Sequence, residues 1–483
     1  MNIFAAVVQL IRKILFQKKY KRLEPEPLIS EKELDAERKN PYFVQIGFDF
    51  GTSYSKCIWR DVMVNKAFVH ICSISEEYEL PFLIPSALVL KNGCLFLVEN
   101  PGIHYPENGL YHLKNALVSV ALKQWDDPVL IPFRNGLGQN GNEQLSEFVE
   151  SCAVYFLSCA FGDIKKRLLE KMSDFGTLAS DYMAINMAVP VADAQRLAVN
   201  NLYQKILCEA WSLADKFAGN SSIKILELNA IRGENQVHAD RNSDSACFIY
   251  PEVSANVQGF VRSRASSPGT YLFSDTGGNS VDQSVFIFMR DSKRGDFLTY
   301  LAAQVHPFGS GQIEQIAAEC ANNTDCYNLE YWRKKKERRE ISPELRIALD
   351  KICDKLKKGT ESTLHLAKSK LIRKEQLIDI RVIFTGGGHC DYPYKYATMH
   401  PFSGRLFPRP IDPDVIGLPI PIDLELAEHE KRWMSRLYVA YGLSFERNNL
   451  SNFIYPKDVP NPEPEEIWKP REISVEFPSK DVT

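Results

Sequence analysis

The chain has 483 residues, 45% of them hydrophobic and 25% charged, which are the proportions of an ordinary globular protein. Its 58 Lys and Arg residues nearly balance 61 Asp and Glu residues, so the net charge of -3 disfavours the basic field of a dedicated DNA-binding protein. The length favours several domain-sized units. The 11 cysteines show no C-x-x-C pair and no zinc-spaced cluster, which indicates a reducing intracellular compartment.

Residues 1–23 have the pattern of an amphipathic helix. Apolar residues between Ile3 and Leu15 fall within one arc at helical spacing, and six Lys and Arg residues precede the first acid, Glu24. Residues 3–22 are therefore expected to lie on an anionic membrane surface, or to dock on the protein's own body or on a partner. The segment is too short and too charged to span a bilayer, and a secretory signal is disfavoured.

The polar, mostly acidic residues 24–40 predict a solvated linker. Residues 450–483 carry repeated prolines among charges, so we expect an extended Pro-rich tail that builds no core. The folded body is expected between residues 41 and 449.

A strand–turn–strand unit covers residues 44–59. An apolar strand ends in Asp49, turns at Gly51 and returns in residues 57–59. Gly51 permits close backbone approach to a ligand, and Asp49 offers a carboxylate to a hydrated metal ion. The turn residues that offer amides and hydroxyls to phosphate oxygens are Thr52, Ser53 and Tyr54. Taken alone, the pattern also fits an ordinary tight hairpin.

Further strand and helix signals follow along the chain. Residues 182–190 predict a strand and residues 193–217 a long amphipathic helix. A second strand–turn–strand unit spans residues 271–288, in which Asp275 and Asp282 can face one cation from opposite limbs. Its turn residues are Gly277, Gly278 and Ser280.

A third glycine signal follows the apolar strand at residues 378–385. This strand runs into Gly386, Gly387, Gly388 and His389, where bare backbone can pack against a nucleobase or a sugar. Small residues within 436–444 predict a helix that packs closely on a sheet.

In this order the segments resemble the actin, sugar kinase and heat-shock ATPase superfamily. They are most similar to the nucleotide-binding domain of DnaK-type heat shock protein 70 chaperones. Gly47-Phe-Asp-Phe-Gly-Thr-Ser-Tyr-Ser55 resembles the first phosphate loop of that family, and Asp275-Thr-Gly-Gly-Asn-Ser-Val-Asp282 resembles the second. The other matching elements are Val189-Pro190, Gln195-Arg196, the adenosine loop Gly386-Gly-Gly388 and the closing helix Val439-Ala-Tyr-Gly442.

The resemblance implies an α/β, two-lobed actin-like ATPase fold, with two ribonuclease-H-like lobes around a nucleotide cleft. The implied parts are lobe I at residues 41–264, lobe II at 265–428 and a closing helix at 429–449. ATP and Mg²⁺ are the implied cofactors. Lobe closure around them would make the protein a switch.

The resemblance also implies the roles of the site residues. The implied catalytic residues are Asp275, Lys114 and Glu252, and the implied metal-site residues are Asp49, Asp275 and Asp282. The implied nucleotide-binding residues are Gly51, Thr52, Ser53, Tyr54, Lys56, Gly277, Gly278, Ser280, Gly386, Gly387, Gly388 and His389.

Some of these assignments leave alternatives open. Lys123 competes with Lys114 for the role of the catalytic lysine. Lys56 stands where the actin branch keeps a phosphate-binding lysine, but it also fits an exposed strand lysine. The stretch before Glu252 exchanges the family's order of proline and acid, so Glu252 either still reaches the water or hydrolysis is slow.

The chain after the closing helix is too short for a peptide-binding domain, so a peptide-holding chaperone is not expected. The expected function is a slowly ATP-hydrolysing, chaperone-like switch that acts through partner proteins. The expected location is the cytoplasm, peripherally at the inner face of a membrane. Alternatives are an actin-like filament protein that self-assembles and a nucleotide-binding scaffold without turnover; a small-molecule kinase ranks last.

Overall fold

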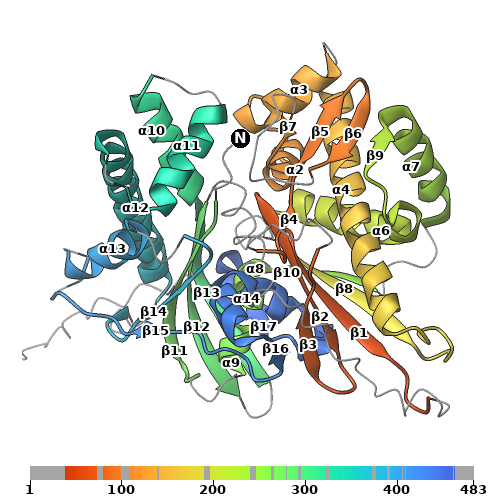
Figure 1. Cartoon of the computed structure of the whole chain (residues 1–483). Helices are drawn as coiled ribbons and strands as arrows, with labels where there is room; N and C mark the ends of the chain where they lie inside the picture. The colour runs from red at the N-terminus through yellow and green to blue at the C-terminus, as the bar shows by residue number, and fades with distance from the viewer. Residues whose placement is uncertain are drawn as a thin grey trace, which may run out of the picture.

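The structure is a computed structural model that describes residues 38–72, 80–98, 109–138, 141–189, 196–239, 246–262, 266–278, 280–291, 295–322, 326–340, 342–371, 377–388, 392–404, 406–407, 409–460 and 462. These residues form a mixed α/β protein with three sheets (Figure 1). The expected helix at residues 1–23, most of the linker, Pro190, Gln195, His389 and the end of the tail lie outside the described residues.

The first sheet has the strand order β10-β8-β1-β2-β3-β16, with β4 beside β2. Antiparallel pairs join β1 to β2 and β2 to β3, while β8, β10 and β16 add in parallel. The strands are β1 (Phe43–Asp49), β2 (Tyr54–Asp61), β3 (Lys66–Val69), β4 (Ile84–Pro85), β8 (Tyr182–Val189), β10 (Cys247–Pro251) and β16 (Leu424–Glu425).

The second sheet has the order β15-β14-β11-β12-β13-β17 and repeats the plan of the first. Its strands are β11 (Gly269–Thr276), β12 (Val281–Asp291), β13 (Gly295–His306), β14 (Arg381–Thr385), β15 (Val415–Ile416) and β17 (Asn452–Ile454). Each sheet has an antiparallel meander of three strands, two parallel strands beside the first strand and a short parallel strand beside the third.

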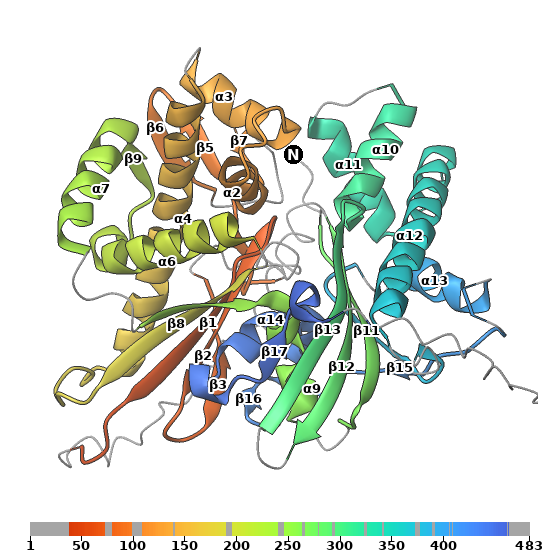
Figure 2. The same ribbon diagram turned by 180° about the vertical axis from the view of Figure 1, so that it is seen from behind.

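Two long helices, α4 (Asn142–Lys171) and α6 (Leu197–Phe217), cover one face of the first sheet (Figure 2). Alternate residues of β1, namely Val44, Ile46 and Phe48, are fully buried in the core that these helices share. The ring of Phe48 meets Phe161 of α4 edge-on, with 5.0 Å between centroids. Because every second side chain of a strand points to the same face, the apolar residues of β1 determine the face on which α4 and α6 pack.

One helix of the described residues, α4, is long and apolar enough to cross a membrane by length and composition. However, 83% of its most apolar window is buried inside the protein. The apolar residues of α4 therefore build the core, and α4 is weak evidence for a membrane span.

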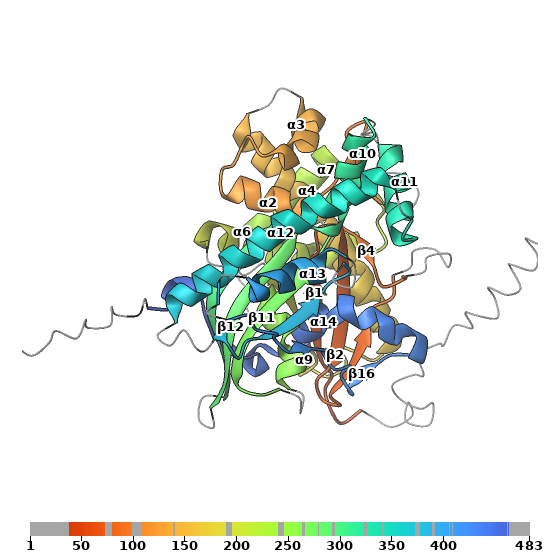
Figure 3. The same ribbon diagram turned by 90° about the vertical axis from the view of Figure 1, so that its left-hand side faces the viewer.

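Helices of the second sheet lie between β13 and β15 in the chain. Figure 3 shows α12 lying across this sheet, where Leu364 and Ala367 join Leu272 of β11 in one core cluster. These helices are α10 (Ser310–Cys320), α11 (Cys326–Glu337), α12 (Pro343–Lys370) and α13 (Tyr394–Met399), followed by the 3-10 helix η3 (His400–Ser403).

The closing helix α14 (Met434–Leu443) packs on the opposite face of β1. A Cβ at Gly47 of β1 would lie 2.2 Å from the Ala440 carbonyl oxygen, and one at Gly442 would lie 1.7 Å from the Ala255 carbonyl oxygen. Both contacts require glycine, as the small residues in 436–444 predict. The helices α8 (Glu252–Asn256) and α9 (Gln258–Val261) link β10 to β11 beside α14.

A small third sheet has the order β7-β5-β6-β9. Its strands are β5 (Leu88–Lys91), β6 (Cys94–Leu97), β7 (Gly109–Leu110) and β9 (Ser222–Lys224). The remaining helices are α2 (Leu113–Ala121), α3 (Ile131–Leu137), α7 (Ile225–Ala239), η1 (Pro128–Leu130), η4 (Glu428–Trp433), η5 (Arg447–Asn449) and η6 (Pro456–Asp458).

The prediction that residues 450–483 build no core is wrong for the first of them. Strand β17 pairs with β13, and the Tyr250 hydroxyl donates to the Ser451 carbonyl at 2.7 Å. The ring of Phe453 also meets Tyr250 edge-on, with 5.5 Å between centroids. The apolar run at residues 453–455 outweighs the surrounding prolines because it closes the edge of the second sheet.

Candidate functional site

Two hairpins place an aspartate directly opposite a second charged residue. In the first hairpin, β1–β2, Asp49 pairs in register with Lys56, and the Lys56 Nζ donates to Asp49 Oδ2 at 2.9 Å. In the second hairpin, β11–β12, Asp275 pairs in register with Asp282. The structure therefore places Asp275 and Asp282 directly across from each other on opposite limbs of the hairpin, and that they face one cation stays a prediction. Lys56 is not an exposed strand lysine, since its side chain is only 18% exposed.

The turns of the two hairpins lie against each other. A Cβ at Gly278 would lie 2.7 Å from Ser53 Oγ of the first hairpin. The first turn of α10 closes the second hairpin, because the Ser310 and Gly311 amides donate to the Gly277 and Gly278 carbonyls at 3.0 and 2.6 Å. The N-terminus of α10 therefore lies beside the meeting point of the hairpins.

The third glycine loop joins the same place. Gly386 has a φ of +84°, and a Cβ there would lie 2.3 Å from Asp275 Oδ1. The Gly388 amide donates to the Thr276 carbonyl at 3.2 Å. A side chain at either position would clash with the second hairpin, and Gly386 also has the left-handed backbone that favours glycine.

A lysine–glutamate pair completes the cluster. Lys114, in the first turn of α2, donates through Nζ to Glu252 Oε2 at 2.8 Å, and both side chains are largely buried. The Tyr203 hydroxyl of α6 donates to the Lys114 carbonyl at 2.9 Å and so fixes the start of α2. The competing Lys123 lies exposed just beyond the end of α2. The structure thus brings Lys114, and not Lys123, to Glu252.

The buried carboxylates of this cluster influence one another. Burial, together with the charges of Glu252 and Asp49, raises the pKa of Asp275 to about 7. Burial and the charge of Glu252 also raise the pKa of Asp282 well above its usual range. Burial by itself would lower the pKa of the Lys114 ammonium, but the charge of Glu252 and other nearby groups raises it. Lys114 therefore stays protonated at neutral pH.

The cluster has more carboxyl groups than positively charged groups. It contains four carboxylates, Asp49, Glu252, Asp275 and Asp282, against the ammonium groups of Lys56 and Lys114. Within the described residues, several buried acceptors here have no hydrogen-bond partner: Asp49 Oδ1, Asp282 Oδ1, Asn256 Oδ1 and Thr276 Oγ1. Buried acceptors without donors are costly, so they indicate a place for a cation and its water molecules.

These residues fit a hydrated Mg²⁺ ion better than a directly ligated metal. No group of three His, Cys, Asp or Glu side chains in the described part of the chain is close enough to hold a metal ion by itself. Mg²⁺ usually keeps several of its water molecules. These water molecules can donate hydrogen bonds to the unpartnered oxygens of Asp49 and Asp282.

Backbone amides beside the candidate cation site are the candidates for contacts with phosphate. The Gly51 amide already donates to the Asp49 carbonyl at 3.0 Å, and the Gly277 amide to the Ser280 carbonyl at 2.9 Å. The glycines at 51 and 277 therefore shape the turns, and within the described residues the neighbouring amides have no hydrogen-bond acceptor, so they can meet a ligand. The candidate amides are those of Thr52, Ser53 and Gly278.

Sequence reasoning missed two residues of this place. Asn256 is buried at the end of α8, four residues after Glu252, and its Nδ2 donates to Asp275 Oδ2 at 2.9 Å and to Thr385 Oγ1 at 3.1 Å. The helical spacing of Glu252 and Asn256 is the signal that could have revealed it. Arg436 of α14 lies against Gly387, its Nε 3.2 Å from where a Cβ would be, and no sequence pattern connects these residues.

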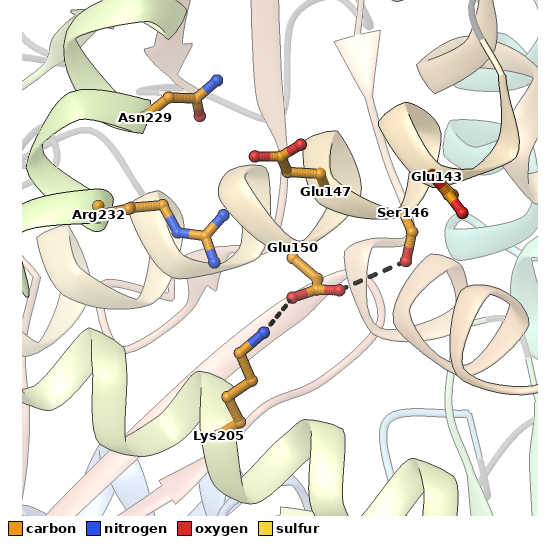
Figure 4. A pocket seen from close by; sticks show the side chains of 8 residues that line it. Glu143, Ser146, Glu147, Glu150, Lys205, Asn229 and Arg232 are labelled. Atoms are coloured by element: carbon orange, nitrogen blue, oxygen red, sulfur yellow. Dashed lines mark hydrogen bonds and ion pairs between the residues drawn. The ribbon is translucent and has the colours of Figure 1, made fainter. Parts of the chain in front are cut away.

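A separate pocket of about 400 Å³ lies among α4, α6 and α7, away from the hairpins (Figure 4). Both of its lining basic residues are paired within the protein: Lys205 with Glu150 at 2.9 Å and Arg232 with Glu209 at 2.6 Å. None of the residues expected for the site lines it. We therefore place the candidate site at the hairpins.

Most of the expected residues come together in the structure. Asp49, Lys56, Lys114, Glu252, Asp275 and Asp282 form one charged cluster, which the three glycine loops border. Tyr54 begins β2 beside this cluster, and His389 lies outside the described residues. A scan of the chain against protein-family models finds no match, and no curated protein matches it.

Proposed function

We propose that the protein is a magnesium-dependent ATP-binding switch of the two-lobed actin-like type, which resembles DnaK-type chaperones and hydrolyses ATP slowly. The observation that carries this proposal is the excess of buried carboxylate at the point where two glycine hairpins meet. Such a place attracts a cation, and the adjoining amides suit the phosphates that accompany it.

The topology supports the same proposal. Two sheets with the same strand order and orientation each present one hairpin to the candidate site. A ligand held by both hairpins would gain contacts from both halves of the molecule. Its binding would therefore favour one relative placement of the halves, which is the requirement for a switch.

The chain's own residues have distinct roles in this proposal. Bound Mg²⁺–ATP supplies the phosphoryl group and neutralises part of the negative charge. Asp49, Asp275 and Asp282 orient the water molecules of the cation site. Lys56 and Lys114 provide positive charge beside that site. Glu252 holds Lys114 and lies close enough to the aspartates to accept a hydrogen bond from a water molecule. No covalent nucleophile is needed, since phosphoryl transfer depends mainly on positioning and charge neutralisation.

The test is phosphate release from ATP and Mg²⁺ by the purified chain, with Lys114→Ala and Lys123→Ala as a matched pair. We expect Lys114→Ala to lower ATP turnover by about 100-fold, because it removes a buried positive charge from the site of phosphoryl transfer. Lys123→Ala removes the same group from an exposed position and should leave turnover unchanged. Equal turnover in the two variants would refute the site.

The dependence on protein concentration separates the related functions. A solitary switch gives turnover proportional to protein concentration, whereas a filament gives a steeper rise together with sedimentable polymer. A scaffold without turnover would instead show a melting temperature that ATP raises, with no phosphate release. If ATP and Mg²⁺ change neither turnover nor melting temperature, the nucleotide proposal is wrong.

A further inference from the structure

The segment between the two sheets carries an exposed apolar strip. This segment supplies β15 to the second sheet and β16 to the first. Between them, the side chains of Ile420 and Ile422 are 42% and 103% exposed. The β2–β3 turn beside them adds Met63 and Val64, which are 55% and 58% exposed. We call these four residues the apolar strip.

Hydrogen bonds show that the two parts of the strip are neighbours. The Ala67 amide of β3 donates to the Asp423 carbonyl at 2.8 Å, next to Ile422. Arg60 Nη1 donates to Asn65 Oδ1 at 2.9 Å and to Asp423 Oδ2 at 2.5 Å, so one guanidinium joins the β2–β3 turn to the segment. Both β3 and β16 lie at the lower end of the first sheet in Figure 1.

The segment is firmly held on both sides of the exposed isoleucines. The Tyr438 hydroxyl donates to the Leu418 carbonyl at 2.5 Å, and the Tyr441 hydroxyl donates to Asp423 Oδ1 at 2.7 Å. Both tyrosines belong to α14, which packs on the first sheet. A well-anchored backbone that exposes isoleucine to solvent leaves apolar area that an occupant can bury favourably.

Charge indicates which occupant fits. Residues 411–430 contain six Asp and Glu residues and no Lys or Arg. In the described part of the chain, Arg60 pairs with Asp423, Lys66 with Glu425 and Lys431 with Glu428. All of these bases come from outside the segment, so the segment's own charge is negative. An anionic bilayer is disfavoured there, and a cationic apolar partner is favoured.

The chain itself contains such a partner. Residues 1–23 have six Lys and Arg residues and no acid, and an apolar arc runs from residue 3 to 15. The described chain begins at Arg38, whose guanidinium binds Asp174 and Asp181. Five residues later the Phe43 carbonyl accepts a hydrogen bond at 2.8 Å from the amide of Val62, the residue before Met63 of the strip. The 21 residues from 17 to 37 can span at most about 70 Å, so the chain is long enough for residues 3–16 to reach the strip.

We propose that residues 3–16 of the chain dock on the apolar strip, with the basic residues that follow lying against the acidic segment 411–430. This docking would place the N-terminal segment on the connection between the two sheets. It does not depend on nucleotide binding, and it assigns the N-terminal segment to the protein's own body instead of to a membrane.

The test is hydrogen–deuterium exchange of the full chain, read out over residues 3–16. The variant Ile420→Ser with Ile422→Ser removes both exposed isoleucines of the strip. Leu226→Ser is the matched control, because Leu226 on α7 is 85% exposed. We expect exchange over residues 3–16 to be about 10-fold faster in the double variant than in the wild type or the control. Equal exchange in all three proteins would overturn the proposal.

Two further arms distinguish the other occupants. If protection of residues 3–16 is lost on dilution, the occupant of the strip is a second copy, and if it appears only with phosphatidylserine vesicles, the occupant is a membrane; either result overturns the proposal. Lys18→Glu with Lys19→Glu changes only residues outside the folded body, so it provides an independent variant if the double serine variant does not fold. Docking predicts faster exchange there too, and unchanged exchange would overturn the proposal.

Discussion

The two hairpins share a backbone plan and differ in the residue opposite their aspartate. In the first hairpin Lys56 neutralises Asp49, whereas in the second hairpin Asp282 faces Asp275 and both pKa values are raised. The protein therefore compensates the charge of Asp49 with its own lysine, whereas the second hairpin needs a cation to be stable with both carboxylates ionised. On the proposed function, the second hairpin depends more strongly on the cation than the first, and four experiments test this difference.

The largest effect is expected from Asp282→Asn. The variant removes one of two facing carboxylates, so ATP turnover should fall by about 100-fold because the cation is no longer positioned. The same change should raise the melting temperature of the protein without metal or nucleotide, since it relieves repulsion with Asp275. A phosphate-release assay measures turnover, and a thermal melt in EDTA measures the melting temperature. A variant with a lower melting temperature as well as lower turnover would show that the two carboxylates do not repel each other.

The pH dependence of stability provides the second test. The folded-state pKa of Asp275 is raised to about 7, so between pH 4 and 7 the folded protein binds more protons at this group than the unfolded chain does. The contribution of Asp275 to the free energy of unfolding therefore decreases as pH rises from about 4 to 7. In EDTA, Asp275→Asn should remove this decrease, and melting curves that change equally with pH in wild type and variant would show that the group is not perturbed.

A smaller effect is expected from a change in the first hairpin, which should destabilise the protein in EDTA where Asp282→Asn should stabilise it. Lys56→Met leaves Asp49 buried without its partner, which should lower the free energy of unfolding by about 2 kcal/mol. Lys56→Arg keeps the charge and serves as the control. Denaturant unfolding in EDTA measures both variants, and a Lys56→Met protein as stable as wild type would mean that the first hairpin does not need its ion pair.

The smallest effect is expected from Asn256→Ala. Asn256 holds Asp275 through one hydrogen bond, so its loss should lower turnover by about 10-fold through poorer positioning. As a positioning residue it should affect the Mg²⁺ concentration that gives half-maximal turnover, while Asn256→Gln should restore part of the activity. Unchanged Mg²⁺ dependence in Asn256→Ala would limit Asn256 to a structural role.

The sequence predicted the local units of the fold well. The strands expected at 44–48, 182–190 and 271–275 correspond to β1, β8 and β11, because apolar runs that end in glycine turns determine local backbone. The expected strand at 378–385 begins only at Arg381. The short apolar run at residues 453–455 was too weak a signal to predict β17, whose pairing partner β13 is far away in the sequence.

The sequence alone determined which residues carry charge and which turns require glycine, because these properties belong to single residues and their neighbours. Only the tertiary structure decided their partners. Lys114 meets Glu252 from 138 residues away, and Asn256 meets Asp275 because α8 ends beside β11. Exposure was likewise decided by packing, since Ile420 and Ile422 look like core residues in sequence and lie in solvent where α14 and β3 hold their segment.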